Sequence, residues 1–290
     1  MLKQRVITAL ALMCVLVPAL LSDSQVPMTI LSLTLCAVGT WEWGRLNGLS
    51  FTGSGVLGGV CSLMCAASWH YEILLVPNYY FWLICTALWV LVASALLRLG
   101  PTRWLNIYLP LRLVAGVWAL FITWLAIYQA KAMSINFLLS IFALVWMADI
   151  GAYFFGRAFG RRKLAVNISP GKSWEGVWGG VFAVILLSWV WVLIDQSRLG
   201  ITDFSEIPNQ IMLEQLSLFS LLGRKGLFIQ ILALIFMVSM SVVGDLLESL
   251  VKRSVGAKDS SKLLPGHGGV LDRIDALLPS LPIAMFWSLI

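Results

Sequence analysis

Charge is the scarcest property of this sequence. Only 12% of its 290 residues are Asp, Glu, Lys or Arg, whereas 60% are hydrophobic. A water-soluble domain carries about 25% charged residues, because its surface has to face water. The low charge therefore excludes an ordinary cytosolic enzyme and a disordered chain, and the apolar excess indicates a protein embedded in a lipid bilayer.

Cysteine and histidine are also rare, with five and two residues. All five cysteines lie in apolar stretches of the first third of the chain, where thiols usually act as small hydrophobic side chains. No histidine or second cysteine pair completes a zinc site near Cys61 and Cys65, so neither a disulfide framework nor structural zinc is expected. The net charge of +6 is interpreted as a sign of membrane topology, and no nucleic-acid partner is expected.

The hydrophobic residues are gathered in nine long runs. A membrane-spanning helix needs about 20 consecutive, mostly apolar residues. We therefore predict an all-α, polytopic integral membrane protein with about nine transmembrane helices, about five of them in residues 1–130 and the others in residues 131–290. The runs are Val6–Leu21, Val26–Trp43, Gly55–Trp69, Tyr79–Leu97, Leu111–Ala130, Ile135–Phe155, Trp174–Ile194, Leu227–Leu247 and Ala276–Ile290.

Basic residues predict the orientation of these helices. Connections on the cytoplasmic side of a membrane carry the excess of Lys and Arg. When the runs cross alternately, all but four of the 20 basic residues fall on the side of the N-terminus, which is therefore predicted to be cytoplasmic. The four exceptions are Lys131, Arg198, Arg224 and Lys225.

The longest connection on the opposite side runs from Asp195 to Gly226. Its apolar residues suggest a segment that lies along the membrane surface. These residues are Ile211, Leu213, Leu216, Leu218, Leu221 and Leu222.

Ionisable residues become frequent from Asp149 onward, at the predicted cytoplasmic ends of the helices. An ionisable residue at membrane depth costs about 2.5–3.5 kcal/mol on insertion scales, so it is usually paired, metal-bound or functional. Asp149, Ala152, Tyr153 and Gly156 share one helical face, which we expect to line a cleft. Neutralisation of Asp149 by Arg157 is the structural alternative.

A polar turn, Ser169 to Gly176, precedes the seventh run. Its Gly-Lys-Ser tripeptide is not a Walker A loop, because Val166 stands where that motif needs glycine. Lys172, Ser173 and the amides of the following helix N-terminus could seat an anion. Alternatively, Ser173 acts only as a helix cap, with Glu175 in the first turn.

The richest cluster begins in the eighth run. Its polar residues recur at helical spacing, so one stripe of an apolar helix turns inward with two carboxylates that require a cation. Carboxylate oxygens close to basic residues favour Mg²⁺ over zinc, and the nearby glycines would let backbone approach a ligand. The stripe residues are Ser241, Asp245, Glu248, Ser249 and Lys252.

Basic residues around this stripe would neutralise phosphate oxygens. The residue types therefore predict phosphoryl or nucleotidyl transfer at a membrane surface, but they identify neither the nucleotide nor the lipid. The basic residues are Lys252, Arg253, Lys258 and Arg273.

The segment from Ser249 to Asp275 resembles the signature of phosphatidate cytidylyltransferases, the CDP-diacylglycerol synthases. Its characteristic residues are Ser-Leu-Val-Lys-Arg at 249–253, Lys-Asp-Ser-Ser at 258–261 and Leu-Pro-Gly-His-Gly-Gly-Val-Leu-Asp-Arg-Ile-Asp at 264–275. Residues 149–156 and 169–176 also resemble family segments. The first 130 residues resemble the family only in hydropathy and in the Trp41-Glu42-Trp43 stretch.

The resemblance implies that CTP and phosphatidate give CDP-diacylglycerol and pyrophosphate with Mg²⁺ at the cytoplasmic face of a bacterial inner membrane. His267 is interpreted as a phosphate ligand or loop organiser rather than a base. The expected catalytic residues are Asp245, Lys252, Arg253, His267, Asp272 and Arg273, the expected substrate-binding residues are Asp149, Lys172, Ser173, Ser249, Lys258, Asp259, Gly268 and Gly269, and the expected metal ligands are Asp245, Asp272 and Asp275.

Two other functions remain open. A CTP-dependent lipid kinase of the polyprenol type would use similar groups but release CDP instead of pyrophosphate. A transporter of anionic lipids would spread polar residues through the membrane depth, commonly in repeated halves, and no internal repeat is visible. The sequence also leaves open a second, monovalent cation and whether the chain forms a homodimer.

Overall fold

A computed structural model describes residues 2–201 and 215–290. Every predicted apolar run contains a helix, because a chain surrounded by lipid has to satisfy its backbone hydrogen bonds internally. These helices are α1 (Leu2–Leu21), α2 (Val26–Leu46), α3 (Phe51–His70), α4 (Tyr79–Leu99), α6 (Leu109–Met133), α7 (Ile135–Phe159), α8 (Trp174–Leu199), α11 (Leu227–Ser254) and α13 (Leu277–Ser288).

Six helices within the described residues are long and apolar enough to cross a membrane, namely α3, α4, α6, α7, α8 and α11. The protein is therefore mostly helical and embedded in a membrane. Helix α13 has 12 residues, eight of them buried and the others partly buried. Its length is about 18 Å, short of the roughly 30 Å of hydrocarbon. Nine spans and the orientation of the N-terminus stay predictions.

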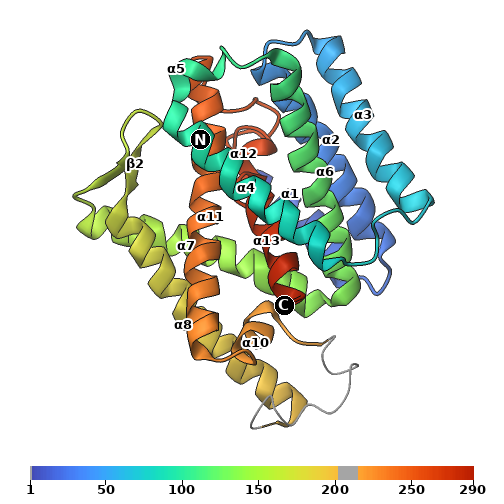
Figure 1. Cartoon of the computed structure of the whole chain (residues 1–290), viewed down its shortest axis with the longest axis vertical. Helices are drawn as coiled ribbons and strands as arrows, with labels where there is room; N and C mark the ends of the chain where they lie inside the picture. The colour runs from blue at the N-terminus through green and yellow to red at the C-terminus, as the bar shows by residue number, and fades with distance from the viewer. Residues whose placement is uncertain (1, 202–214) are drawn as a thin grey trace.

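The prediction of an all-α chain missed a small hairpin. Strand β1 (Lys163–Ala165) pairs antiparallel with β2 (Ser169–Ser173), with Lys163 opposite Ser173 and Ala165 opposite Ser169. Strands of three and five residues show no useful periodicity in the sequence. The hairpin projects sideways from the junction of α7 and α8 (Figure 1).

Helices α6, α11 and α13 form the centre of the molecule, and α2 and α3 cover the outer side of α6 (Figure 1). Helices α7 and α8 approach closely because glycine lies between them. A Cβ atom at Gly180 would come 2.7 Å from the carbonyl oxygen of Ala148, and one at Gly176 would come 2.9 Å from that of Ala152. This packing carries the hairpin to the side of α11.

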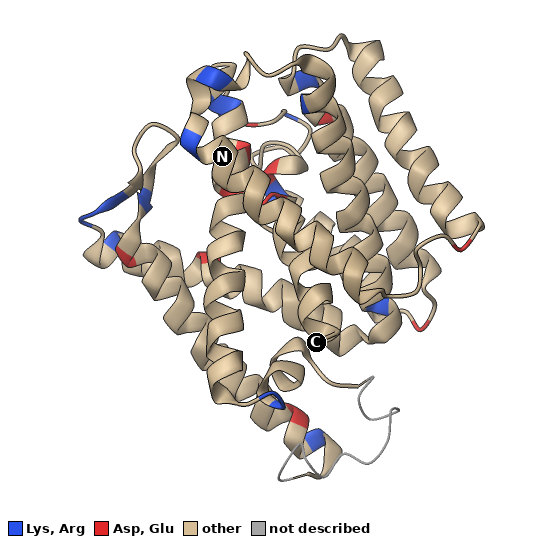
Figure 2. Cartoon of the chain, in the orientation of Figure 1, with Lys and Arg blue, Asp and Glu red and all other residues tan. Residues whose placement is uncertain are grey.

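Three short helices complete the described structure: α5 (Pro101–Trp104), α10 (Leu218–Gly223) and α12 (Leu271–Ile274). Basic side chains are concentrated at the end of the molecule that carries α5 and the hairpin, with fewer at the opposite end (Figure 2). Acidic and basic side chains also occur inside the molecule, beside α11 and α12.

The segment around α10 corrects the expectation of a surface-lying helix. Leu216, Leu218 and Leu222 are buried in the protein core. The buried carboxylate of Asp195 accepts hydrogen bonds from the Ser217 amide and hydroxyl and thereby draws this segment inward. Leu221 is only partly buried, and Ile211 and Leu213 lie outside the described residues.

Candidate active site

Helix α11 turns its predicted polar stripe toward the interior. Ser241, Glu248, Ser249 and Lys252 are buried, and Asp245 is half-buried. The Ser249 hydroxyl donates a hydrogen bond to Asp245 Oδ1 at 3.2 Å. The inward stripe that the helical spacing predicts is therefore present.

Lys252 joins two carboxylates. Its ammonium forms an ion pair with Glu248 on the same helix and a second one with Asp272 Oδ1 on α12, at 2.5 Å. All three side chains are at least nine-tenths buried. Removing one member of such a buried pair leaves an uncompensated charge, so this cluster fixes α12 against α11.

Asp272 is held by the glycine-rich loop as well as by Lys252. Its Oδ2 atom accepts hydrogen bonds from the Ser260 amide at 2.8 Å, the Ser260 hydroxyl at 2.9 Å and the Gly269 amide at 2.7 Å. Burial by itself raises the pKa of Asp272, but the hydrogen bonds from Lys252, Gly269 and Ser260 lower the pKa to about 2. The group is therefore an anion at neutral pH.

The glycines of the loop have a packing role. Gly268 has a φ of +82°, and a Cβ atom there would come 2.6 Å from Asp272 Oδ2. A Cβ atom at Gly269 would come 2.1 Å from the Ser260 hydroxyl. The loop needs glycine for its own contacts, and approach of a substrate to Gly268 and Gly269 remains a prediction.

Glu42 is a residue of the site region that the sequence analysis missed. Although it belongs to α2, its fully buried carboxylate accepts hydrogen bonds from Ser260, Ser261, Val270 and Leu271. The available signal was a carboxylate in the middle of an apolar run, which membrane insertion disfavours unless the group has partners.

Glu248 is a second residue of the site region that is absent from the expected site residues. It belonged to the predicted stripe but to none of the expected functional groups, and it pairs with Lys252. Its spacing of four residues from Lys252 was the available signal.

The hairpin brings Lys172 to α11. The Lys172 ammonium lies 2.7 Å from Asp245 Oδ2. The neighbouring Ser173 caps α8 by accepting a hydrogen bond from the Gly176 amide at 3.2 Å. Glu175 accepts hydrogen bonds from the Arg161 and Arg162 amides. The capping interpretation therefore holds for Ser173, while Lys172 reaches the polar stripe.

Two further carboxylates take part in the same electrostatic cluster. Asp149 is exposed and interacts through space with Lys172, Asp245 and Arg273. The Arg157 guanidinium, the alternative partner of Asp149, instead donates to the Tyr153 hydroxyl at 3.0 Å.

Asp275 is half-buried. Desolvation raises the pKa of Asp275 to about 7, and the negative charge of Asp245 adds to the shift. The charge of Asp245 therefore disfavours ionisation of Asp275.

The remaining predicted residues surround this cluster. Arg253 is exposed and bonds to the carbonyl oxygens of Ile168 and Ala257, while Arg273 bonds to that of His267. The half-buried His267 has a buried Nδ1 atom without a hydrogen-bond partner among the described residues, and its role as a phosphate ligand or loop organiser stays a prediction. Lys258 and Asp259 are exposed.

The carboxylates fit the predicted Mg²⁺ only in part. Within residues 2–201 and 215–290, no group of three or more His, Cys, Asp or Glu side chains is close enough to hold a metal ion. Asp272 is already engaged by four hydrogen bonds. Asp245 and Asp275 offer hard oxygen ligands and a mutual repulsion that a divalent cation would relieve. The magnesium site remains a prediction.

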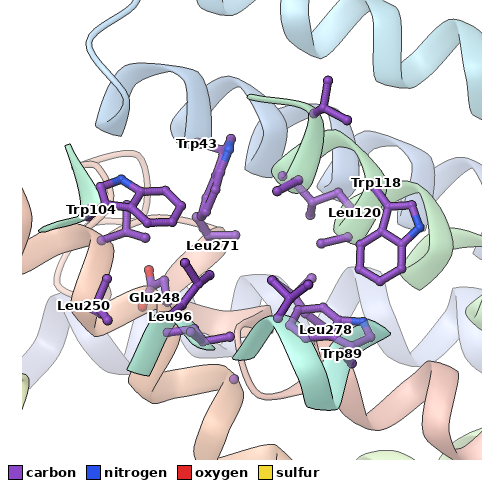
Figure 3. Close-up of a pocket in the computed structure, with 18 of the residues that line it drawn as sticks. Trp43, Trp89, Leu96, Trp104, Trp118, Leu120, Glu248, Leu250, Leu271 and Leu278 are labelled. Carbon is purple, nitrogen blue, oxygen red and sulfur yellow. The ribbon is translucent and has the colours of Figure 1, made fainter. Parts of the chain in front are cut away.

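An apolar cavity of about 310 Å³ adjoins the cluster. Helices α2, α4, α5, α6, α11, α12 and α13 form its wall, and Glu248 is the one charged side chain among the described residues that line it. Figure 3 shows Glu248 at the edge of this cavity, among aromatic and aliphatic side chains. Those labelled in the figure are Trp43, Trp89, Leu96, Trp104, Trp118, Leu120, Leu250, Leu271 and Leu278.

Comparison with known proteins gives concordant matches. The model of the cytidylyltransferase family matches residues 3–290. The phosphatidate cytidylyltransferase of Pseudomonas aeruginosa is 34% identical over 295 residues, covering 99% of this chain and 98% of that protein. The enzyme of the same name from Haemophilus influenzae is 43% identical over 150 residues, which cover 52% of this chain and 44% of that protein. A Staphylococcus aureus relative of that name is 35% identical over 156 residues, with 54% and 50% covered.

Proposed function

Because the chain belongs to the cytidylyltransferase family and makes CDP-diacylglycerol from CTP and phosphatidate, we propose that this reaction takes place where α11, α12 and the β1–β2 hairpin meet. The observation that carries the proposal is the convergence of Lys172, Asp245, Lys252 and Asp272 beside an apolar cavity. Charged groups for a triphosphate and an apolar space for a lipid then lie side by side.

The chemistry is a nucleotidyl transfer. A phosphate oxygen of phosphatidate attacks the α-phosphorus of CTP in line, a new phosphoanhydride bond forms, and the bond to pyrophosphate breaks. Lys172 and Arg273 stabilise the negative charge on the transferring and departing phosphates. The attacking phosphate is already an anion near neutral pH, so the site needs no strong general base.

Magnesium is the proposed cofactor. Bound Mg²⁺ would neutralise part of the triphosphate charge. Asp245 and Asp275 would hold it, because the two carboxyl groups interact electrostatically and each has fewer hydrogen-bond and ion-pair partners than Asp272. Asp272 serves the site by orienting Lys252 and the loop.

The lipid is proposed to enter from the membrane. Its acyl chain would occupy part of the apolar cavity, and its phosphate would reach the cluster past Glu248. We further propose that nine helices cross the inner membrane with the N-terminus in the cytoplasm, the short α13 doing so inside the helix bundle, where protein surrounds it. This orientation places the basic end of the molecule, and with it the site, on the cytoplasmic side.

The experiment measures which phosphate of CTP is transferred to the lipid. Purified protein is incubated with phosphatidate, Mg²⁺ and CTP labelled at either the α- or the γ-phosphate. The α-label should enter the lipid and the γ-label should leave as pyrophosphate. A γ-label on the lipid with release of CDP would establish a lipid kinase instead. Transfer of lipid between leaflets without any covalent label would support a transporter.

A further inference from the structure

A carboxylate from the N-terminal part of the chain reaches the loop that holds Asp272. We propose that Glu42 is a positioning residue, which sets the geometry of Asp272 through the loop of residues 258–271. The inference rests on the proposed function, because it concerns the same site. It gives α2 a role in the reaction, whereas every site residue expected from the sequence lies in the C-terminal half.

Glu42 closes the loop at both ends. At the first end, it accepts hydrogen bonds from the Ser261 hydroxyl at 2.5 Å and the Ser260 hydroxyl at 3.1 Å. At the other end, it accepts hydrogen bonds from the Val270 amide at 3.0 Å and the Leu271 amide at 2.7 Å. One side chain therefore joins the start of the loop to the start of α12.

Asp272 also accepts hydrogen bonds from the same loop. The Ser260 hydroxyl lies 3.1 Å from Glu42 Oε2 and 2.9 Å from Asp272 Oδ2, so the two carboxylates share its single proton, which is donated to one of them at a time. A Cβ atom at Gly269 would come 2.3 Å from Glu42 Oε1, while the Gly269 amide donates to Asp272. The loop has no free space between them, and a shift of Glu42 has to move Asp272 and its partner Lys252.

The four donors require a carboxylate. An ionised carboxylate only accepts hydrogen bonds, whereas the amide of glutamine presents two N–H donors on one side. The substitution Glu42→Gln preserves the volume but turns an NH₂ group toward one serine hydroxyl and one backbone amide. The hydroxyl can rotate and accept a hydrogen bond, whereas the amide of Val270 or Leu271 loses its acceptor in a fully buried place.

Asp195 provides a matched control. It is as deeply buried, with 2% exposure, and also accepts four hydrogen bonds. The donors are Asn136, the amide and hydroxyl of Ser217, and Ser220, and they secure the segment before α10. Asp195→Asn therefore makes the same chemical change in a segment that has no bond to Asp272.

The experiment combines hydrogen exchange with kinetics on the full-length protein in lipid nanodiscs. In Glu42→Gln, amides of residues 258–271 should exchange at least tenfold faster, and kcat should fall about 100-fold, as expected when catalytic groups shift by about 1 Å. In Asp195→Asn, exchange should rise at residues 215–223, with kcat within twofold of the wild type. Equal loop exchange in Glu42→Gln and wild type would overturn the inference.

One result separates this inference from the proposed function. Faster loop exchange in Glu42→Gln, together with a wild type that makes no CDP-diacylglycerol, refutes the function and leaves Glu42 as the organiser of the loop. If Glu42→Gln does not fold, Ser261→Ala removes one of the four donors instead. It should speed loop exchange and lower kcat severalfold, and wild-type values for both would overturn the inference.

Discussion

At the scale of single residues, Lys252 is the link between two parts of the site. Its ammonium faces Glu248 and Asp272, so α11 and α12 are joined by one cation between two carboxylates. The hydrogen bonds that lower the pKa of Asp272 to about 2 keep this carboxyl group charged at neutral pH. The geometry of the site therefore depends on the charge of Asp272 and not only on its size.

Asp272→Asn tests this dependence. The neutral amide weakens the pair with Lys252 and the hold on the loop, so turnover should fall by about 10² to 10³ fold while the protein still inserts into the membrane. The measurement is incorporation of labelled CMP into lipid per mole of folded protein. Glu72→Gln, an exposed change in the turn after α3, is the control with unchanged turnover. Nearly normal incorporation by Asp272→Asn would show that this charge is not needed.

Lys172 makes a separate prediction, since its ammonium contacts Asp245 from the hairpin. Lys172→Ala should raise the apparent KM of one anionic substrate about tenfold, because the lost cation no longer attracts its phosphate. Steady-state kinetics with CTP and phosphatidate varied separately give the answer. Lys163→Ala, at an exposed position on β1 of the same hairpin, should leave both values unchanged. Unaltered kinetics in Lys172→Ala would show that Lys172 contacts no substrate and serves only as the ion-pair partner of Asp245.

At the scale of elements, the sequence predicts what depends on long local patterns. Apolar runs locate the long helices because lipid surroundings force the backbone to bond within each run. The stripe on α11 follows from the spacing of Asp245, Ser249 and Lys252. Shorter elements escape prediction because tertiary contacts create them. Asp195 draws α10 inward, and the register of β1 with β2 has no counterpart in sequence periodicity.

The sequence predicts the site itself only in part, for the same reason. Helical spacing places Asp245 and Lys252 on one face, whereas nothing local shows that Glu42 meets a loop more than 200 residues later. The sequence suggests that Gly268 and Gly269 allow the backbone to approach a substrate closely. The structure adds contacts with Asp272, Ser260 and Glu42, which become visible only when the loop is folded.

Gly269→Ala should therefore disrupt the loop. The new methyl group would come 2.1 Å from the Ser260 hydroxyl and 2.3 Å from Glu42 Oε1, so the loop has to shift and CMP incorporation should fall at least 100-fold. Gly55→Ala, in a part of α3 with open space around the added Cβ, is the matched control and should keep full activity. Equal activity of the two variants would mean that the loop tolerates displacement without loss of function.

At the scale of the whole molecule, the chemistry crosses the predicted boundary between residues 1–130 and 131–290. Glu42 from α2 holds the loop of the C-terminal region, and Trp43, Trp89 and Trp118 from the N-terminal region line the cavity next to Glu248. The N-terminal helices thus supply most of the apolar wall and one anchor, while the C-terminal region supplies the rest of the wall and the charged groups. A lipid-modifying enzyme needs both environments within reach of one phosphate.

Ala115 lies in the cavity wall, and Ala115→Phe should fill space that the acyl chain uses. Displacing about two methylene groups costs about 1.6 kcal/mol, which corresponds to a rise in the KM of phosphatidate of roughly tenfold. The KM of CTP should stay the same, and a phosphatidate with short acyl chains should lose less. Val56→Phe, at an exposed position on α3, adds the same ring without touching the cavity and should behave as wild type. An unchanged KM for phosphatidate in Ala115→Phe would show that the cavity does not receive the lipid.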